Sequence, residues 1–197
     1  MSTTLPRAML VAWIVLGTAG FVGPTARAVQ AQVYLTPEQA LREIFPEAGR
    51  TETEHRTLTS AALERLEQRL GRPVPGAQRE ITRVFDANGV FLGYAVIAHE
   101  IGKYRPITFM VGVTPDFSVR DVAVMVYRES RGGDVRRERF LSQYRGKSTD
   151  DHITTNRDII NISGATISVR SMNFGVKRVL AELEELYAAP MSAARQR

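Results

Sequence analysis

The sequence predicts an α+β domain in which an antiparallel sheet is bracketed by helices. Between Arg79 and Tyr127 the hydrophobic period is two and turn residues recur at short intervals, which predicts a meander of consecutive strands. Two helical patterns precede this stretch, and a long one follows it from Thr166 to Ala189. The 197 residues, 44% hydrophobic and 24% charged, suit a folded domain with its own core.

Both helices before the sheet carry clear start signals. A Thr-Pro-Glu-Gln capping box at 36–39 opens the first, with proline at its first helical position. Thr59 caps the second helix, and Gly71 stands where it should end. The expected elements are a helix at 37–45, a short extended stretch at 51–57 and a helix at 60–70.

Four strands are expected between the second helix and the last. An Asp-Ala-Asn-Gly turn at 86–89 separates the first two, and a Thr-Pro-Asp-Phe turn at 114–117 separates the last two. The strands are expected at 79–85, 90–101, 106–113 and 119–127. The expected connections to the last helix are a loop at 128–134, a short helix near 135–144, an irregular segment at 146–157 and an extended piece at 159–162.

The last helix has an apolar stripe at three- and four-residue steps. The stripe consists of Ile167, Val169, Met172, Val176, Val179, Leu180, Leu183 and Leu186. The charged residues expected to face away from the core are Arg170, Lys177, Arg178, Glu182 and Glu185. The pattern therefore predicts a helix that is buried along one side.

The first 31 residues show the three parts of a secretory signal. Arg7 precedes an uncharged run, and Gly23 and Pro24 break any helix. An A-x-A site ends at Ala28, and a weaker second site, Val-Gln-Ala, ends at Ala31. The run is almost long enough to span a bilayer, so a retained anchor is the alternative. The Gly-Pro break favours cleavage, and we expect a protein exported to the periplasm or to the outer face of the cytoplasmic membrane.

Composition excludes several classes of function. The absence of cysteine rules out disulfides, Cys-ligated zinc and an iron–sulfur cluster of this chain's own. Loss of residues 1–28 leaves 24 basic residues against 21 acidic ones, and no basic run is interleaved with aromatics, so nucleic acid is not an expected partner. The three histidines lack metal-ligand spacing, and no G-x-S-x-G hydrolase motif is present.

The sharpest chemical signal is the segment Ile162-Ser-Gly-Ala-Thr-Ile-Ser168, at the entrance to the last helix. Hydroxyls and a glycine stand where the first backbone N–H groups of a helix lack intrahelical partners. Such an end attracts anions, and small residues let a phosphate approach the backbone closely. An ordinary hydroxyl cap on a core helix explains the same residues, and the pattern alone favours that simpler interpretation.

The string Ser163-Gly-Ala-Thr-Ile-Ser168 resembles the flavinylation motif of the FMN-binding domain family. That family includes the flavin-carrying subunits of sodium-translocating NADH:quinone reductases and Rnf complexes, together with many small exported electron carriers. The resemblance implies that Thr166 carries FMN through a phosphoester bond. It also implies an FMN transferase, outside the cytoplasmic membrane, that makes this bond.

The resemblance extends from about Gly93 to Leu180. Residues 102–107 look like the family's glycine-rich entry to a strand, and 111–126 like its central hairpin. The loop 128–133 takes the place of the family's E-T-P-G loop. The family pattern often has an acid six residues before the threonine, where this chain has Ile160; the nearest acid is Asp158.

By this resemblance, FMN would contact the motif and the loop. The implied cofactor-binding residues are Ser163, Gly164, Ala165, Thr166, Ile167 and Ser168, with Arg128, Glu129, Arg131, Gly132 and Gly133. No catalytic residue and no metal ligand are implied. The expected divisions of the chain are a signal peptide at 1–31, a helical segment at 32–78, an FMN-binding domain at 79–190 and a disordered tail at 191–197.

The function implied is that of an exported electron-transfer flavoprotein, a redox carrier rather than a self-contained enzyme. Its partners would be the FMN transferase and membrane or exported redox proteins. Two alternatives stay open at this point. A flavin-dependent oxidoreductase would turn over a small acceptor without a protein partner, and a non-redox binding module would remain colourless when produced with the transferase and FMN.

Overall fold

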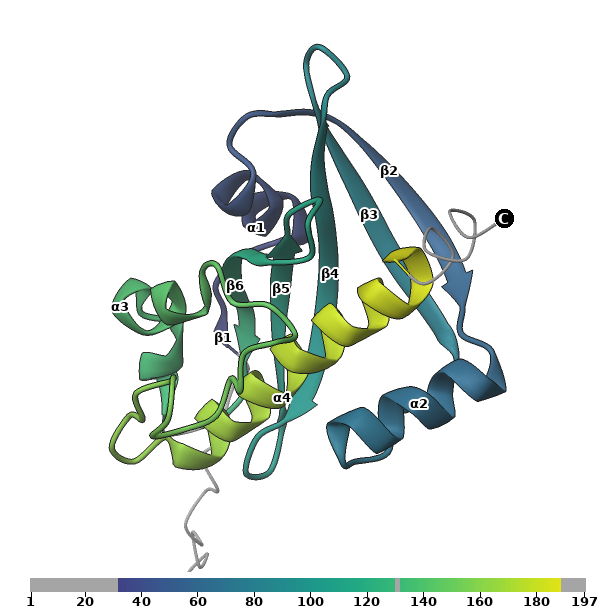
Figure 1. Ribbon diagram of the computed structural model, residues 1–197. Helices are drawn as coiled ribbons and strands as arrows, with labels where there is room; N and C mark the ends of the chain where they lie inside the picture. The colour runs from purple at the N-terminus through teal and green to yellow at the C-terminus, as the bar shows by residue number, and fades with distance from the viewer. Residues whose placement is uncertain (1–31, 130–131, 189–197) are drawn as a thin grey trace, which may run out of the picture.

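The structure, a computed structural model, describes residues 32–129 and 132–188 and has the predicted α+β architecture. Six strands form one sheet in the order β1-β6-β5-β4-β3-β2 (Figure 1). They are β1 (Gln32–Val33), β2 (Ala48–Thr57), β3 (Gln78–Asp86), β4 (Phe91–Ile101), β5 (Pro106–Val113) and β6 (Val119–Tyr127). The helices are α1 (Pro37–Ile44), α2 (Ser60–Leu70), α3 (Glu138–Leu141) and α4 (Thr166–Leu183).

The predicted four-strand meander is confirmed, and each edge of the sheet carries one more strand. β3 to β6 pair consecutively and antiparallel. The stretch expected at 51–57 begins earlier, at Ala48, and pairs with β3 along its length. β1 pairs with the far end of β6. The extended piece expected at 159–162 is not a strand, because only Ile159 forms a bridge there, with Thr155.

The helices form where their sequence signals predicted. Thr36 and Gln39 make the capping box of α1, and α2 ends at Gly71 in the left-handed conformation, with φ of 66°. The short helix expected near 135–144 is divided into two turns of 3-10 helix, Gly133–Arg136 and Ser142–Tyr144, on either side of α3. A π-helical turn, Glu184–Ala188, continues α4. None of the described helices is both long and apolar enough to cross a membrane.

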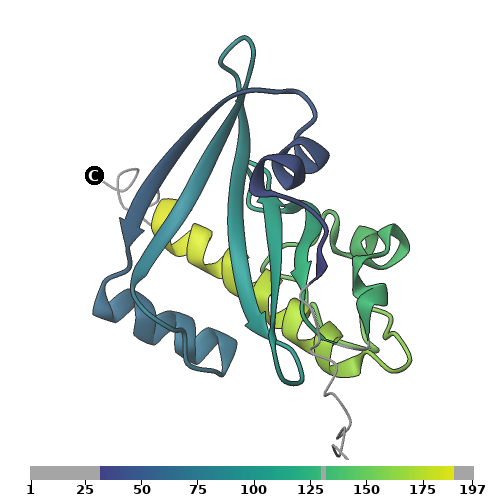
Figure 2. The ribbon, with the colours of Figure 1, turned by 180° about the vertical axis from the view of Figure 1, so that it is seen from behind.

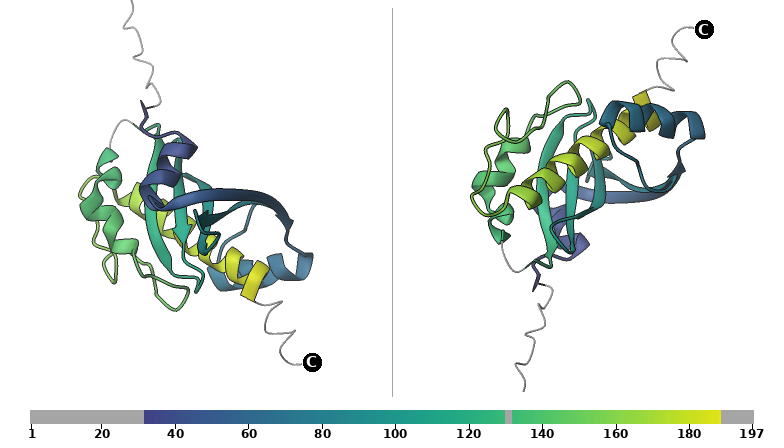
Figure 3. Two further views of the ribbon diagram at one scale, coloured as in Figure 1. Left: turned by 90° about the horizontal axis from the view of Figure 1, so that it is seen from above. Right: turned by 90° about the horizontal axis from the view of Figure 1, so that it is seen from below.

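The two faces of the sheet are covered by different helices (Figures 1 and 2). α4 lies on the face where Phe109 and Val111 are buried against its apolar side. α1 lies on the opposite face, where Ile44 and Phe45 close over Gly112, leaving no room for a side chain at that glycine. α2 sits beside the C-terminal half of α4, on the same side of the sheet (Figure 3).

β3 and β4 separate beyond their turn, and a cluster of buried charges fills the space between them. The two strands pair only from Phe85 and Phe91 to Thr82 and Ala95, and they then diverge (Figure 1). Four side chains from three elements meet in this space: Arg79, Glu100, Arg178 and Glu182.

The ion pairs within this charge cluster are close and shielded from water. Arg178 Nη2 lies 2.8 Å from Glu100 Oε1, and Arg178 Nη1 lies 3.0 Å from Glu182 Oε1. Arg79 Nη2 approaches the same Glu182 oxygen at 2.8 Å. Burial raises the pKa of the Glu100 carboxyl, although the Arg178 guanidinium opposes that shift. Two positive and two negative charges therefore neutralise one another inside the fold.

The charge cluster corrects the prediction for α4. Arg178 and Glu182 were expected to face solvent, but they are only 9% and 2% exposed. Ile167, expected in the apolar stripe, is exposed instead. The prediction was wrong because a hydrophobic period counts charged residues as outward-facing, whereas divergent strands leave a polar gap that charged partners can fill.

Candidate functional site

A tight turn places Thr166 at the first position of α4. Ala165 N donates to Ile162 O at 2.9 Å, which closes the turn. Gly164 within it has φ of 79°, with open space where a Cβ would lie. The glycine is therefore required by backbone conformation rather than by crowding, since a left-handed L-residue costs about 1–2 kcal/mol.

The start of α4 has no side-chain cap. The N-cap position is Ala165, and among the described residues no side-chain cap hydrogen bond is made to the first turn. The first intrahelical bond runs from Val169 N to Ala165 O. The simple hydroxyl cap, which the sequence alone favoured, is therefore not the arrangement found. The positive end of the helix is left open to an anion.

The Thr166 hydroxyl is held by a neighbouring amide. Asn161 Nδ2 donates to Thr166 Oγ1 at 2.9 Å, and Thr166 is half-buried. The other atom of that amide, Asn161 Oδ1, is buried without a hydrogen-bond partner among the described residues. The structure thus shows an amide, not an acid, beside the threonine. The Ile160 side chain is exposed, and the Asp158 carboxylate is engaged elsewhere.

Thr166 lines a pocket of about 340 Å³ on the outer side of α4. This volume is at the lower end of small-molecule sites, roughly 300–1,000 Å³. The lining residues come from α4, the end of α2 and the segment before the motif: Leu70, Ile153, Thr154, Thr155, Asn156, Thr166, Arg170, Asn173, Phe174 and Lys177. They include two cations and no acid.

The cations of this pocket lie along the same side of α4 as the threonine. Arg170 follows Thr166 by one helical turn, and Lys177 lies about two turns further on. Neither forms an ion pair within the described part of the chain. Phe174 supplies an aromatic wall, and the Arg72 guanidinium carbon lies 4.2 Å from the centre of its ring. The pocket therefore combines a hydroxyl, positive charge and an aromatic surface.

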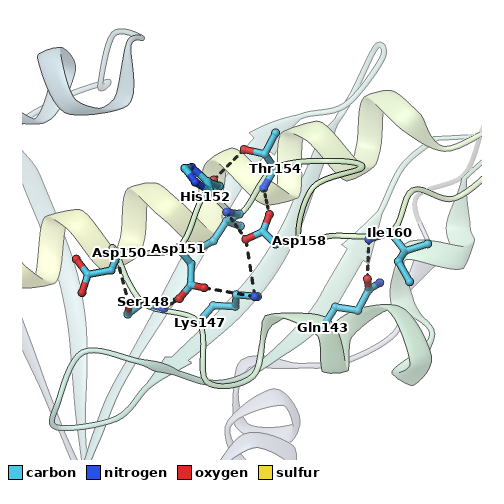
Figure 4. A network of polar contacts seen from close by, with 10 residues as sticks. Gln143, Lys147, Ser148, Asp150, Asp151, His152, Thr154, Asp158 and Ile160 are labelled. Carbon is cyan, nitrogen blue, oxygen red and sulfur yellow. Dashed lines mark hydrogen bonds and ion pairs between the residues drawn. The ribbon is translucent and has the colours of Figure 1, made fainter.

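The opposite wall of the pocket is a strained loop. Ile153 and Asn156 have φ of 43° and 64°, and both line the pocket. A positive φ is unfavourable for a β-branched residue such as isoleucine, so the surrounding contacts must hold it in place. The Asp158 carboxylate does this by accepting from Ile153 N at 2.7 Å and from Thr154 N at 2.6 Å (Figure 4).

Lys147 completes the support of this loop. Its Nζ lies 3.8 Å from Asp158 Oδ2 and 3.4 Å from Asp151 Oδ1, so one cation joins two turns of the segment (Figure 4). Burial by itself would raise the pKa of Asp158. The N–H donors of Thr154 and Ile153, with Lys147, outweigh that effect and hold the pKa below its ordinary value.

Asp158→Asn is expected to destabilise the fold by about 1–2 kcal/mol at neutral pH, because one backbone N–H then loses its acceptor. A carboxyl with a depressed pKa stabilises the fold above its unfolded pKa, near 4, and loses that contribution as the pH falls through the folded value. Urea unfolding from pH 6 to pH 2.5 should show this loss in the parent chain and a flatter profile in Asp158→Asn. Asp150→Asn is the control, since the Asp150 side chain points away into solvent (Figure 4). Parallel profiles for parent and Asp158→Asn would contradict this role.

Only part of the predicted loop at 128–133 meets the motif. Gly132 has φ of 87°, and a Cβ there would lie 3.2 Å from Ala165 Cβ and 3.3 Å from Ser168 Oγ, so this glycine is packed against the start of α4. Gly133 lies nearer to Tyr34. Arg131 is outside the described residues.

The charged residues of that loop are engaged away from Thr166. Arg128 Nη1 donates to Pro106 O at 3.2 Å and to Thr108 Oγ1 at 3.1 Å, on the α1 side of the sheet. The Glu129 carboxylate accepts from Tyr104 N and Arg105 N in the turn between β4 and β5. A contact of either side chain with a flavin stays a prediction.

The remaining motif residues divide into buried and exposed ones. Ser168 is buried, and its Oγ lies 3.0 Å from the Tyr127 hydroxyl, which ties α4 to β6. Burial raises the pKa of that tyrosine. Ala165 is buried, whereas Ser163 and Gly164 are exposed. Ser168 therefore positions the helix, and the exposed turn leaves Thr166 approachable.

Several residues of the site escaped sequence reasoning: Asn161, which bonds the Thr166 hydroxyl, and the pocket residues Arg170, Asn173, Phe174 and Lys177. A signal for three of them existed. Residues 166, 170, 173 and 177 recur at helical spacing and so share one side of α4 with the threonine. The amide of Asn173 joins the Tyr144 hydroxyl, at 2.7 Å, to the Thr155 hydroxyl, at 3.2 Å. It therefore fixes the strained loop to the helix.

A larger hollow of about 630 Å³ lies between α1 and the divergent strands. Arg79, Arg178 and Glu182 line it, and they belong to the charge cluster that Glu100 makes neutral overall. Across the described ranges, no group of acidic and histidine side chains is arranged to hold a metal ion. The pocket at Thr166 is therefore the candidate site, because Arg170 and Lys177 in its lining form no ion pair within the described residues.

Comparison with known proteins identifies the domain that carries this pocket. Residues 102–181, which include the motif and most of α4, match the family described as FMN-binding domain. The match covers a part of the chain, from the end of β4 to the last turns of α4. A crystal structure of Shewanella oneidensis NqrC is also similar, with 19% identity and a TM-score of 0.49, covering 71% of this chain and 81% of that one. Among curated proteins, none matches the chain.

The pocket has features that suit an FMN group. Arg170 and the uncapped start of α4 suit a phosphate. The buried, unpartnered Asn161 Oδ1 is an acceptor for a donor that the described part of the protein does not supply. Phe174 and Leu70 offer apolar surface to a ring system. We conclude that the residues present fit FMN.

Proposed function

We propose that this chain is an exported electron-transfer protein that carries FMN on Thr166 through a phosphoester bond. The observation that supports it best is the position of the Thr166 hydroxyl. It stands at the uncapped start of α4 and on the wall of a pocket that has two cations and no acid. A hydroxyl so placed is an acceptor for a phosphoryl group, and its surroundings favour the negative charge that remains after the transfer.

Attachment replaces the O–H bond of the Thr166 hydroxyl with an O–P bond. Its Oγ1 forms a bond to the phosphorus of a flavin nucleotide activated by a second phosphate. The bond from that phosphorus to the second phosphate breaks, and the leaving phosphate takes the electron pair. The hydroxyl proton goes to a base of the FMN transferase, and the chain supplies the acceptor alone. In this scheme Asn161 Nδ2, 2.9 Å from Oγ1, orients the oxygen.

Once attached, FMN would supply reversible electron transfer, and the chain would position and shield it. Arg170 and the first N–H groups of α4 would neutralise the phosphodiester. Phe174 would face the ring system, and Lys177 would favour negative charge on it. The loop 153–156, fixed by Asp158 and Asn173, would keep that wall in place.

Export is part of the proposal, because the transferase acts outside the cytoplasmic membrane in the family that the motif resembles. Residues 1–31 carry the signal-like pattern and lie outside the described residues. The first described residue, Gln32, opens β1. A cleavage after Ala28 or Ala31 would therefore leave every described element intact. The partners proposed are the FMN transferase and membrane or exported redox proteins.

The full chain, produced with an FMN transferase in an export-competent bacterium, tests this function. We expect the intact mass to rise by one FMN minus one water, with yellow colour that survives denaturation. N-terminal sequencing should begin at Val29 or Gln32. Production without the transferase is the control and should give the unmodified mass. Colour that washes out on denaturation would contradict the covalent bond, and an intact Met1 in the membrane fraction would favour the anchor.

A further inference from the structure

We propose that the tip of the β4–β5 hairpin and the first turns of α4 form a docking surface for an acidic redox protein. This docking surface consists of Ile101, Lys103, Tyr104, Arg105, Ile167 and Arg170. The hairpin and the first half of α4 lie side by side in both opposite views (Figures 1 and 2). The inference rests on the proposed function, because it concerns the protein that exchanges electrons with the flavin.

Exposed apolar side chains are concentrated on this surface. Six large hydrophobic residues are well exposed in the described part of the chain, and three of them lie here: Ile101, Tyr104 and Ile167. Tyr104 is 74% exposed and Ile101 is 65% exposed. Ser171 joins the two elements, since its hydroxyl donates to Ile101 O at 2.6 Å and lies 3.0 Å from Ile167 O. Exposed apolar side chains gathered on neighbouring elements are typical of interaction sites.

Most of the charges around this apolar centre are positive. Lys103, Arg105 and Arg170 are all exposed. The neighbouring acid, Glu129, is occupied by the backbone N–H groups of Tyr104 and Arg105, at 2.6 Å and 2.9 Å. A basic rim around an apolar centre complements an acidic rim around an apolar patch, and such complementarity guides association.

The hairpin tip is held in one conformation. Gly102 N donates to Arg105 O at 2.9 Å, which closes the turn. A Cβ on Gly102 would lie 2.9 Å from Glu129 Oε1, so the carboxylate is packed directly against the turn. A surface that is ordered before binding loses less conformational entropy when a partner docks.

The location of the docking surface indicates a redox partner. Ile167 directly follows Thr166, and Arg170 belongs to both the docking surface and the pocket wall. A protein bound here would bring its own cofactor next to the flavin. The docking surface is therefore placed for electron transfer rather than for attachment to an unrelated structure.

The test uses an acidic [2Fe–2S] ferredoxin as the probe. Each reduced ferredoxin gives one electron, so two reduce one flavin, which takes its protons from water. Stopped-flow absorbance at low ionic strength should show a reduction rate about 3–10-fold slower for Lys103→Gln/Arg105→Gln than for the parent chain. The matched control is Arg42→Gln/Arg139→Gln, which removes two exposed cations on α1 and α3. This control removes the same net charge from other parts of the surface, and it should slow the reduction less than about 2-fold.

A second pair of variants tests the apolar centre. Ile101→Ser/Tyr104→Ser should weaken ferredoxin binding about 5–20-fold, whereas Val90→Ser, at the opposite end of β4, should not. Calorimetry measures this binding on the purified chain with or without flavin, so failure of attachment leaves the docking test valid. Equal affinities and equal salt dependence for all variants would overturn the docking surface. A second result would also overturn it: Lys103→Gln/Arg105→Gln weakens binding of the chain to phosphatidylglycerol vesicles but leaves ferredoxin binding unchanged.

Discussion

Thr166→Val is expected to abolish covalent FMN completely while leaving the fold intact. Valine keeps the shape and the branching of threonine but has no oxygen to bond to phosphorus. The substitution removes the 2.9 Å hydrogen bond that Asn161 Nδ2 donates to the threonine hydroxyl, so the free energy of unfolding should fall by about 1 kcal/mol. Intact mass and absorbance after denaturation, for chains produced with the FMN transferase, measure the attachment.

The matched control for this variant is Thr57→Val, which makes the same chemical change at the exposed end of β2. It should gain the full FMN mass. Peptide fragmentation of the parent should place the added mass on the segment that contains Thr166. If Thr166→Val keeps the added mass, another hydroxyl is the acceptor, and the role of the pocket beside α4 must be reassigned.

Glu182→Gln is expected to cost about 3–5 kcal/mol of folding free energy. The glutamine occupies nearly the same volume, but it leaves Arg79 and Arg178 with Glu100 as their only negative partner in the charge cluster. A net positive charge then stays buried, because Arg79 and Arg178 are 8% and 9% exposed. Urea unfolding at pH 7 measures the loss, and the glutamine variant should have a lower midpoint with a similar slope.

Two further variants test the cause of that loss. Glu185→Gln removes an exposed pairing with Arg65 nearly one helical turn away, and should cost no more than about 1 kcal/mol. Arg79→Leu/Glu182→Leu removes one charge of each sign and should recover most of the stability lost by Glu182→Gln. If the single variant costs no more than Glu185→Gln, the cluster is better solvated than its burial indicates.

The fold was predictable wherever a local signal decides the structure. The capping box at 36–39 and the left-handed Gly71 bound their helices because a few hydrogen bonds and one backbone conformation suffice. The meander followed from short turns between alternating strands. The burial of charges between β3 and β4 was not predictable, because it depends on Arg79 meeting Glu182, and through it Arg178, between segments far apart in the chain.

The sequence predicts Thr166 at the centre of the candidate site, but it does not predict the residues that form the walls of the pocket. The motif located Thr166 because its glycine and small residues are a local requirement of the turn. The wall at 153–156 depends on Asp158 and Asn173 holding a strained Ile153, which no short pattern records. The side of the sheet on which Arg128 lies could have been predicted from strand alternation. Tyr127 points toward α4, so the next residue points to the opposite side.

β1 determines where the N-terminal segment joins the folded domain. Gln32 pairs with Tyr127, and the hydroxyl of that tyrosine contacts Ser168 in the first turn of α4. Gln32, the first described residue, therefore lies at the same corner of the molecule as the motif. A segment kept in the membrane would suspend the domain with its cofactor end toward the lipid. Redox partners embedded in the bilayer would then meet a flavin carried on Thr166, as proposed, without any reorientation of the domain.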